Sequence, residues 1–274
     1  MDRRSFLKSM ATGLVVAGSP GLATAAGDMD TVADRHVKDY LTKIKNFNEH
    51  FQDDIILDER QFALLKKVAN RLNNVQRMVG YANFSMLDMD GALSVGRRYS
   101  SVGEFTAEEK DFLEKLFYTN AGEYGFYGEK VFAGFTAKVA DRDTLKIPGS
   151  GHYLFRGKPE ALYNKIARDL RNNVVLTSGV RGLVKQMHLF VLKAIESKGN
   201  LSMASRSLAP PGYSFHGIGD FDVGKRGYGY RNFTEDFAQT DEFKRLSDLG
   251  YINIRYFENN PFGVRFEPWH IKVV

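Results

Sequence analysis

The clearest pattern of hydrophobic positions lies in the N-terminal part of the chain, from residue 28 to about residue 84. Apolar residues recur there at steps of three and four, which places them on one stripe of a helix. Basic side chains fill much of the other face, and a solvated outer face explains them better than a membrane or polyanion contact. The pattern predicts a helical N-terminal region. The stripe consists of Phe62, Leu65, Val68 or Ala69, Leu72, Val75 and Val79.

The next hundred residues are less regular. Residues 85–104 predict a loop because they contain Asp88, Asp90, Gly91 and Gly96. The capping box from Thr106 to Glu109 predicts the start of another helix. Glycines and aromatic residues dominate residues 119–157, which indicates either the irregular wall of a groove or a few short strands. His152 lies in this stretch, and packing or a substrate contact explains it better than metal ligation.

The last third of the chain alternates short helices and strands. Because the connections between the expected strands are short, we expect antiparallel pairing. The predicted fold class is therefore α+β: a small antiparallel sheet with helices, behind a helical N-terminal extension. Helices are expected from Pro159, over 183–198 and over 240–249, and strands over 174–177, 252–257, 262–266 and 271–274, with a further strand starting at Phe221.

Composition narrows the classes of function. The chain has 274 residues, 43% of them hydrophobic, which is enough for one large domain or two modest ones. The formal charge of +5 and the lack of a basic stripe with interleaved aromatics argue against nucleic-acid binding. The chain has no cysteine, so disulfides and thiolate zinc sites are excluded. Any zinc would have to be held by histidine and carboxylate side chains.

Residues 1–26 have the features of an export signal. The string RRSFLK, which begins at Arg3, resembles the twin-arginine motif. A mildly apolar run over 10–16 follows, and Ala23 and Ala25 supply the small residues of a cleavage site. Later in the chain no segment reaches the ~20 apolar residues of a transmembrane helix. We therefore expect an exported, periplasmic protein without a membrane span in its mature chain.

The densest candidate chemistry lies near the C-terminus. His216, Asp222 and His270 offer two imidazoles and a carboxylate, and Glu267 offers a second carboxylate. This set fits a catalytic zinc site, which has three protein ligands, an open position for water and a base beside it. A His/His/carboxylate set also suits iron(II) or manganese, so the sequence leaves the identity of the metal open.

The spacing of these residues makes geometric demands. Zinc bonds of about 2.0–2.2 Å place any two ligand atoms within roughly 4 Å of each other. The six residues from His216 to Asp222 would span roughly 20 Å in an extended chain. The segment must therefore fold back, and Gly217 and Gly219 permit the backbone angles of a tight turn. Pro268 favours a short turn in the Glu-x-x-His string.

Two strings resemble a known family. The string APPGYSFH, which ends at His216, is followed by Gly219 and Asp222 and resembles the Ser-x-His-x-x-Gly-x-x-x-Asp signature of VanY-type D-alanyl-D-alanine carboxypeptidases. The string EPWH, which begins at Glu267, looks like the Glu-x-x-His motif of the same family. The usual spacing from His to Asp is one residue longer in that family, which leaves Asp220 as a weaker candidate for the ligand.

A third string strengthens the resemblance. TSGVR, which ends at Arg181, and the later Gln186 are similar to the family's Ser-Gly-Tyr-Arg…Gln stretch. Val180 and Gly182 replace the usual Tyr and Ser on either side of the arginine, which affects the shape of the substrate pocket. The three motifs occur in the family's order and cover about residues 160–274.

The resemblance implies a fold similar to the hedgehog/DD-peptidases and a zinc-dependent D-alanyl-D-alanine carboxypeptidase that trims peptidoglycan stem peptides. It implies His216, Asp222 and His270 as zinc ligands and Glu267 as the general base. We therefore expect a twin-arginine signal peptide over 1–26, a helical and Gly/aromatic-rich N-terminal region over 27–158, and a zinc peptidase catalytic domain over 159–274.

The expected substrate contacts leave alternatives open. Arg181 would either stabilise the oxyanion or hold the substrate's carboxylate, and Ser214 and Gln186 are second-rank contacts. A peptidoglycan endopeptidase or an L,D-carboxypeptidase would use the same zinc chemistry. A zinc-stabilised wall-binding module without catalysis is an alternative of another class. Glu267 argues against that module, because a purely structural zinc site is closed and needs no spare base.

Overall fold

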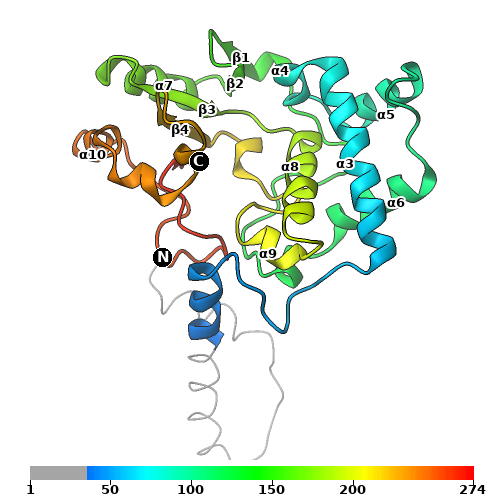
Figure 1. Ribbon diagram of the computed structural model, residues 1–274. Coiled ribbons are helices and arrows are strands. Elements are labelled where there is room, and N and C mark those ends of the chain that lie inside the picture. Colours follow the sequence, from blue (N-terminus) through cyan, green and yellow to red (C-terminus); the bar gives the residue numbers. More distant parts are fainter. Residues whose placement is uncertain (1–35) are drawn as a thin grey trace, which may run out of the picture.

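A computed structural model describes residues 36–274 of the chain. The predicted twin-arginine leader and its cleavage site lie outside these residues. Figure 1 shows a predominantly helical half on one side and a smaller half with sheets and helices on the other. Among the described residues, no helix combines the length and the apolar character that crossing a membrane requires.

The helical half is built on α3 (Glu59–Val79), and it confirms the predicted apolar stripe. Leu65 and Leu72 are fully buried, and the Asp58 side chain accepts a hydrogen bond from the backbone N–H of Gln61 at the start of the helix. The remaining helices of this half are α4 (Tyr81–Phe84), α5 (Met89–Arg98), α6 (Ala107–Tyr118), α8 (Leu183–Glu196) and α9 (Leu201–Ser205).

The prediction of a loop over residues 85–104 was wrong, because α5 occupies the middle of that stretch. Asp88 caps the helix by accepting a hydrogen bond from the N–H of Gly91, 2.7 Å away. Gly96 lies inside the helix at a close contact: a Cβ there would come within 2.9 Å of the carbonyl oxygen of Gly103. The glycine that suggested a loop therefore marks tight packing of a helix.

Residues 119–157 combine the two expected possibilities, since most of the segment is irregular and one hairpin forms. The hairpin pairs β1 (Thr144–Ile147) with β2 (His152–Phe155) in antiparallel register. The hairpin leads into α7 (Lys158–Asp169), which has Pro159 in its first turn, as predicted.

The second sheet has three antiparallel strands in the order β3, β4, β5, which confirms the predicted α+β class with a small antiparallel sheet. Asp222 in the central strand is in register with Ser178 on one side and His270 on the other. A core that includes side chains of α7 and α10 packs against this sheet. The bounds are β3 (Val174–Ser178), β4 (Phe221–Lys225), β5 (His270–Ile271) and α10 (Asp241–Asp248).

The strands predicted over 252–257 and 262–266 do not form, and Ile254 makes only an isolated bridge to Ile271. Backbone groups in this region bind side chains and distant loops instead of a neighbouring strand. Asn260 donates to the carbonyl of Val264 at 2.6 Å, for example. The β-branched and aromatic residues that suggested strands therefore pack in an irregular segment.

A buried ion pair fastens the N-terminal segment to the rest of the chain. Arg206 donates two hydrogen bonds to the carboxylate of Asp54, at 2.7 and 3.1 Å, and Asn200 donates a third at 2.6 Å. The side chains of Asp54 and Arg206 are only 2% and 4% exposed. The backbone of Ile55 also pairs with that of Leu201 at 2.8 Å. Removing one partner of such a pair would leave the other charge buried without compensation.

We expect Asp54→Ala to lower the free energy of unfolding by about 3–5 kcal/mol, because Arg206 would stay buried without its counter-ion. Asp53→Ala is the matched control: Asp53 is 69% exposed and pairs with Lys43, so its loss should cost less than about 1 kcal/mol. Urea unfolding of both variants measures the difference. Equal losses in the two variants would contradict the role assigned to the buried pair.

Candidate active site

The sheet places three polar side chains in one row. In a sheet, residues directly opposite each other on neighbouring strands project from the same face. Ser178, Asp222 and His270 occupy such positions on β3, β4 and β5. The side chain of Asp222 is 1% exposed and that of His270 is 3% exposed. The central strand therefore holds a buried carboxylate between a hydroxyl group and an imidazole.

His216 reaches this row because the chain turns back on itself after a short 3-10 helix, η3 (Phe215–Gly217). Gly219 has a φ of +141°, a conformation that strongly favours glycine, as the sequence predicted. Gly217 serves a different purpose, because a Cβ at this position would come within 2.7 Å of the Phe132 ring. One glycine permits the turn, and the other permits its packing.

The three predicted ligands converge. The Nε2 atom of His216 and the Nδ1 atom of His270 lie 3.1 and 3.2 Å from the same oxygen, Oδ1 of Asp222. The three candidate ligand atoms lie within 4.8 Å of one another. Bonds of about 2.1 Å in a tetrahedral zinc site separate ligand atoms by roughly 3.4 Å, and the two distances to Asp222 are close to that value.

Outer hydrogen bonds determine which nitrogen of each imidazole points inward. Nδ1 of His216 lies 2.8 Å from the carbonyl oxygen of Gly179, and Nε2 of His270 lies 3.0 Å from a carboxylate oxygen of Asp220. Both oxygens can only accept, so these nitrogens carry the protons. The inward nitrogens, Nε2 of His216 and Nδ1 of His270, therefore face Asp222. Such outer contacts orient the histidines of metal sites.

The surroundings of His216, Asp222 and His270 favour a bound positive charge. Burial lowers the pKa of His216 to about 4, which keeps its imidazole neutral. Burial opposes the charge on His270 as well, but the carboxylates of Asp220 and Asp222 raise its pKa to about 9. Without a metal, His270 therefore carries a proton on Nδ1 that it shares with Asp222. That proton bridges only two of the three groups, whereas a divalent cation in its place would contact all three.

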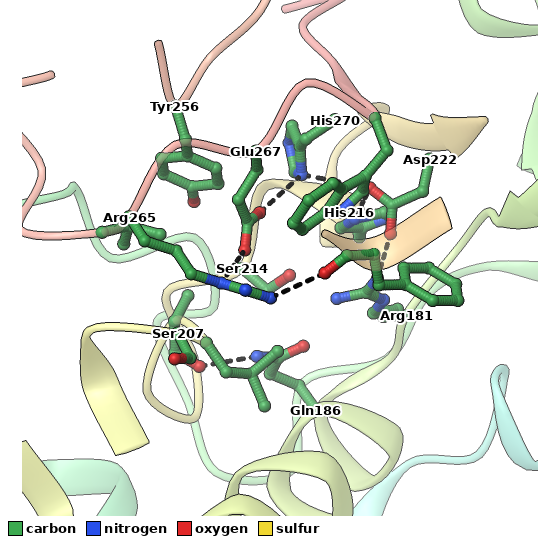
Figure 2. Close-up of a pocket in the computed structure, with 15 residues that line it drawn as sticks. Arg181, Gln186, Ser207, Ser214, His216, Asp222, Tyr256, Arg265, Glu267 and His270 are labelled. Carbon is green, nitrogen blue, oxygen red and sulfur yellow. Dashed lines mark hydrogen bonds and ion pairs between the residues drawn. The ribbon is translucent and has the colours of Figure 1, made fainter. Parts of the chain in front are cut away.

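Glu267 lies beside the cluster as a second carboxylate. Its Oε2 atom is 3.9 Å from Nδ1 of His270, too far for a hydrogen bond. The predicted short turn forms, and the N–H of His270 donates to the carbonyl of Glu267 at 3.1 Å. Burial raises the pKa of Glu267 to about 7, against the opposing charges of Arg265 and His270. Figure 2 shows Glu267 between His270 and Arg265.

Arg181 and Gln186 both line the cavity beside the cluster, which has a volume of about 170 Å³. Arg181 donates to Oδ2 of Asp222 and, at 2.8 Å, to the hydroxyl of Ser178. The side-chain amide of Gln186 donates to the carbonyl of Ala209 at 2.6 Å. All the residues predicted for the site line this cavity: Arg181, Gln186, Ser214, His216, Asp222, Glu267 and His270.

The two other internal histidines stand apart from the cluster. His152 packs edge-on against Tyr81, with ring centroids 5.7 Å apart, and burial lowers its pKa to about 4. His188 contacts the side chain of Asn73 at 2.8 Å and packs edge-on against Phe84. Both positions agree with the expectation that neither residue is a metal ligand.

Sequence reasoning missed several residues of the site. Asp220, considered only as an alternative ligand, supports His270 and is itself held by Arg255. Ser178 orients Arg181. Arg265 lines the cavity and lies 4.0 Å from Glu267. The sequence did contain one signal for two of them. Asp220 is two residues from Asp222, and Arg265 is two residues from Glu267. Residues two apart in an extended segment point to the same side.

Comparison with known proteins finds a family to which part of the chain is similar. Residues 159–274 match the family model described as VanY: D-alanyl-D-alanine carboxypeptidase. This range covers less than half of the chain and includes all the predicted site residues. A search of curated proteins found no match.

Solved structures give more distant similarities. The chain is 21% identical to the LdcB LD-carboxypeptidase, with a TM-score of 0.40, and the alignment covers 47% of this chain and 63% of that one. It therefore spans less than two thirds of that protein. A mutant of the vancomycin-resistance D,D-pentapeptidase VanY from a VanB-type cassette, in complex with Zn(II), is 21% identical with a TM-score of 0.40. The alignment covers 48% of this chain and 78% of that one.

VanYB in complex with D-alanine-D-alanine has the same identity of 21% and the same TM-score of 0.40. In this case the alignment covers 48% of this chain and 76% of that one. The similarity to the VanY family rests on the family model and not on these distant structures, and it extends over residues 159–274.

Proposed function

We propose that the chain is a zinc-dependent D-alanyl-D-alanine carboxypeptidase that removes the last residue of peptidoglycan stem peptides. One observation carries the proposal: two oriented imidazoles and a carboxylate converge, while a separate buried carboxylate remains beside them. A purely structural zinc site would be closed and would not need the second carboxylate. The family match of residues 159–274 supports the choice of substrate.

In this proposal His216, Asp222 and His270 hold the metal through Nε2, a carboxylate oxygen and Nδ1. Zinc in such a site lowers the pKa of a bound water to about 7 and polarises the scissile carbonyl. Gly179 and Asp220 accept hydrogen bonds from the outer nitrogens of the two imidazoles, which turns the inward nitrogens toward the metal position. The protein thus presents a neutral His216 and a charged Asp222, the forms that bind a metal.

Glu267 is the proposed general base. Its carboxylate takes a proton from the attacking water and later passes it to the leaving amine. Burial keeps its pKa close to neutrality, which suits a group that must accept and release a proton in each cycle. Its distance of 3.9 Å from His270 places it next to the metal ligands without making it one of them.

Arg181 is the proposed electrostatic partner of the reaction. Two of its N–H groups are already used by Asp222 and Ser178, which leaves fewer of them for a substrate carboxylate. Its fixed charge next to Asp222 is better suited to stabilise negative charge that develops on the scissile carbonyl oxygen. Ser214 and Gln186 line the cavity as further substrate contacts.

The proposed substrate agrees with the predicted location. Peptidoglycan lies outside the cytoplasm, and the twin-arginine string at Arg3 predicts export. We therefore propose that the enzyme acts in the periplasm or elsewhere outside the cytoplasm.

We expect the wild-type protein to bind one zinc ion per chain and His216→Ala or Asp222→Ala to bind it at least about 100-fold more weakly, because each variant removes a ligand. His152→Gln is the control: it replaces a buried histidine outside the cluster and should retain the wild-type affinity. Competition against a chelating dye measures affinity, and elemental mass spectrometry measures stoichiometry. Wild-type affinity in either ligand variant would refute the ligand set.

We expect Glu267→Gln to retain one zinc per chain and to lose about 10²–10⁴-fold in kcat on a pentapeptide muropeptide, because the variant cannot accept a proton. Glu258→Gln, which changes an exposed carboxylate, serves as the control. Mass spectrometry of the products defines the reaction: loss of one alanine indicates a carboxypeptidase, and a split stem indicates an endopeptidase. Cleavage of a tetrapeptide but not a pentapeptide would indicate an L,D-carboxypeptidase.

Unchanged hydrolysis in Glu267→Gln would remove Glu267 as the base. If the zinc-loaded wild-type protein hydrolysed no muropeptide at all, the peptidase proposal would fail. A zinc-stabilised wall-binding module would then be the better description.

A further inference from the structure

A second arginine of the cavity, Arg265, has no role in the chemistry proposed above. Its guanidinium lies between two aromatic rings, 4.7 Å from the centroid of Phe47 and 5.0 Å from that of Trp269. Its Nη2 atom donates to the carbonyl of Phe233 at 3.0 Å. The side chain is 18% exposed. The guanidinium is thus held in place by its faces, while part of its edge stays available to a ligand.

Three polar atoms in the wall of this cavity lack partners. Among the residues that the structure describes, Nε of Arg265, Oε1 of Gln186 and Oγ of Ser207 are buried without a hydrogen bond. All three residues line the same cavity. Gln186 is 0% exposed and Ser207 is 7% exposed. Buried polar groups without partners are costly, so three of them in one wall indicate that a polar ligand completes them.

The two arginines of the cavity differ in what they can still bind. Arg181 already donates to Asp222 and Ser178. Arg265 lies 4.0 Å from the carboxylate of Glu267, which is beyond hydrogen-bond distance, and its Nε–H is therefore free. Guanidinium groups bind carboxylates through two parallel N–H groups. Arg265 is the arginine of the cavity that is suited to that task.

Arg265 lies close to the proposed metal ligands. One oxygen of Glu267 is 3.9 Å from the ligand nitrogen of His270, and the other is 4.0 Å from Nε of Arg265. A single carboxyl group thus separates the metal ligands from the guanidinium. In an exopeptidase substrate one residue separates the scissile carbonyl from the terminal carboxylate, so the group that binds this carboxylate must lie near the metal ligands.

We propose that Arg265 binds a carboxylate of the peptide substrate and thereby determines specificity. Ser207 donates its hydroxyl to the same carboxylate, and Oε1 of Gln186 accepts a substrate N–H. The inference rests on the proposed peptidase function. The carboxylate comes either from the C-terminus of the peptide or from an acidic side chain within the stem, and the two sources can be separated by experiment.

The test compares wild type, Arg265→Gln and Arg245→Gln on matched stem pentapeptides. Arg245 lies on the exposed side of α10 and controls for the loss of a positive charge. One pair of peptides ends in a free acid or in an amide, and a second pair carries the acidic side chain free or amidated. We expect wild type to prefer the carboxylate form of one pair by roughly 10- to 100-fold in kcat/KM. Arg265→Gln should reduce that preference to below about threefold, chiefly through KM.

The pair that shows the loss identifies the source of the carboxylate. If Arg265→Gln loses the preference for the free acid over the terminal amide, Arg265 binds the C-terminal carboxylate. If it loses the preference for the free acidic side chain over the amidated one, Arg265 binds the side-chain carboxylate. Preferences that persist in Arg265→Gln overturn the inference. An equal loss on all four peptides also overturns it, because Arg265 would then act through Glu267 or through the fold.

Calorimetry without turnover separates this inference from the peptidase proposal. The free-acid pentapeptide is titrated into zinc-loaded Glu267→Gln with and without Arg265→Gln, after thermal unfolding has shown that both variants are folded. We expect at least tenfold weaker binding when Arg265 is replaced. Binding that depends on Arg265 in a protein whose wild type hydrolyses nothing would refute the peptidase and retain the carboxylate site. Equal binding in the two variants would overturn the carboxylate site even if hydrolysis were observed.

Discussion

The carboxylate of Asp222 is the constraint on which the site depends. It is buried in the central strand of the sheet, with one oxygen bound to Arg181 and the other facing two imidazoles. A buried charge is stable only when its surroundings compensate it. The turn that delivers His216 and the two-residue strand that delivers His270 both bring compensating groups to this oxygen. The contacts that hold the strands of the sheet together are therefore also the contacts that form the site.

The N-terminal region forms part of the main hydrophobic core and also helps to position a residue of the cavity. The largest core cluster combines residues of α3 and α6 with residues of α8, which follows directly after the Arg181 loop. The ion pair between Asp54 and Arg206 fixes the chain next to Phe47, whose ring contacts the guanidinium of Arg265. The N–H of Arg265 also donates to the carbonyl of Arg206 at 2.9 Å. A residue at the edge of the site is thus positioned by contacts with a segment far away in the sequence.

The sequence predicted features that local chemistry determines. The apolar stripe of α3 and the capping box of α6 follow from residues close together in the chain, and both helices form. The candidate ligand set was proposed from its residue types and spacing, and the structure brings the three side chains together. The strands expected over 252–257 and 262–266 failed because their backbone partners are side chains and distant loops, such as Asn260 and the N–H of Tyr127. Arg265 was missed for a similar reason, since its aromatic neighbour Phe47 lies more than two hundred residues away.

The two imidazoles of the cluster differ because their outer partners differ. His216 donates to a neutral carbonyl, and burial keeps its pKa low. His270 donates to the carboxylate of Asp220, which the hydrogen bonds from His270 and Arg255 keep charged although burial opposes the charge. A carboxylate partner makes an imidazole more basic and a stronger ligand than a carbonyl partner does. In the proposed metal site the stronger of the two imidazole ligands would therefore come from the last strand, where Asp220 also accepts from the backbone N–H of Val273. One carboxylate, Asp220, thus both fixes the C-terminus and tunes the site.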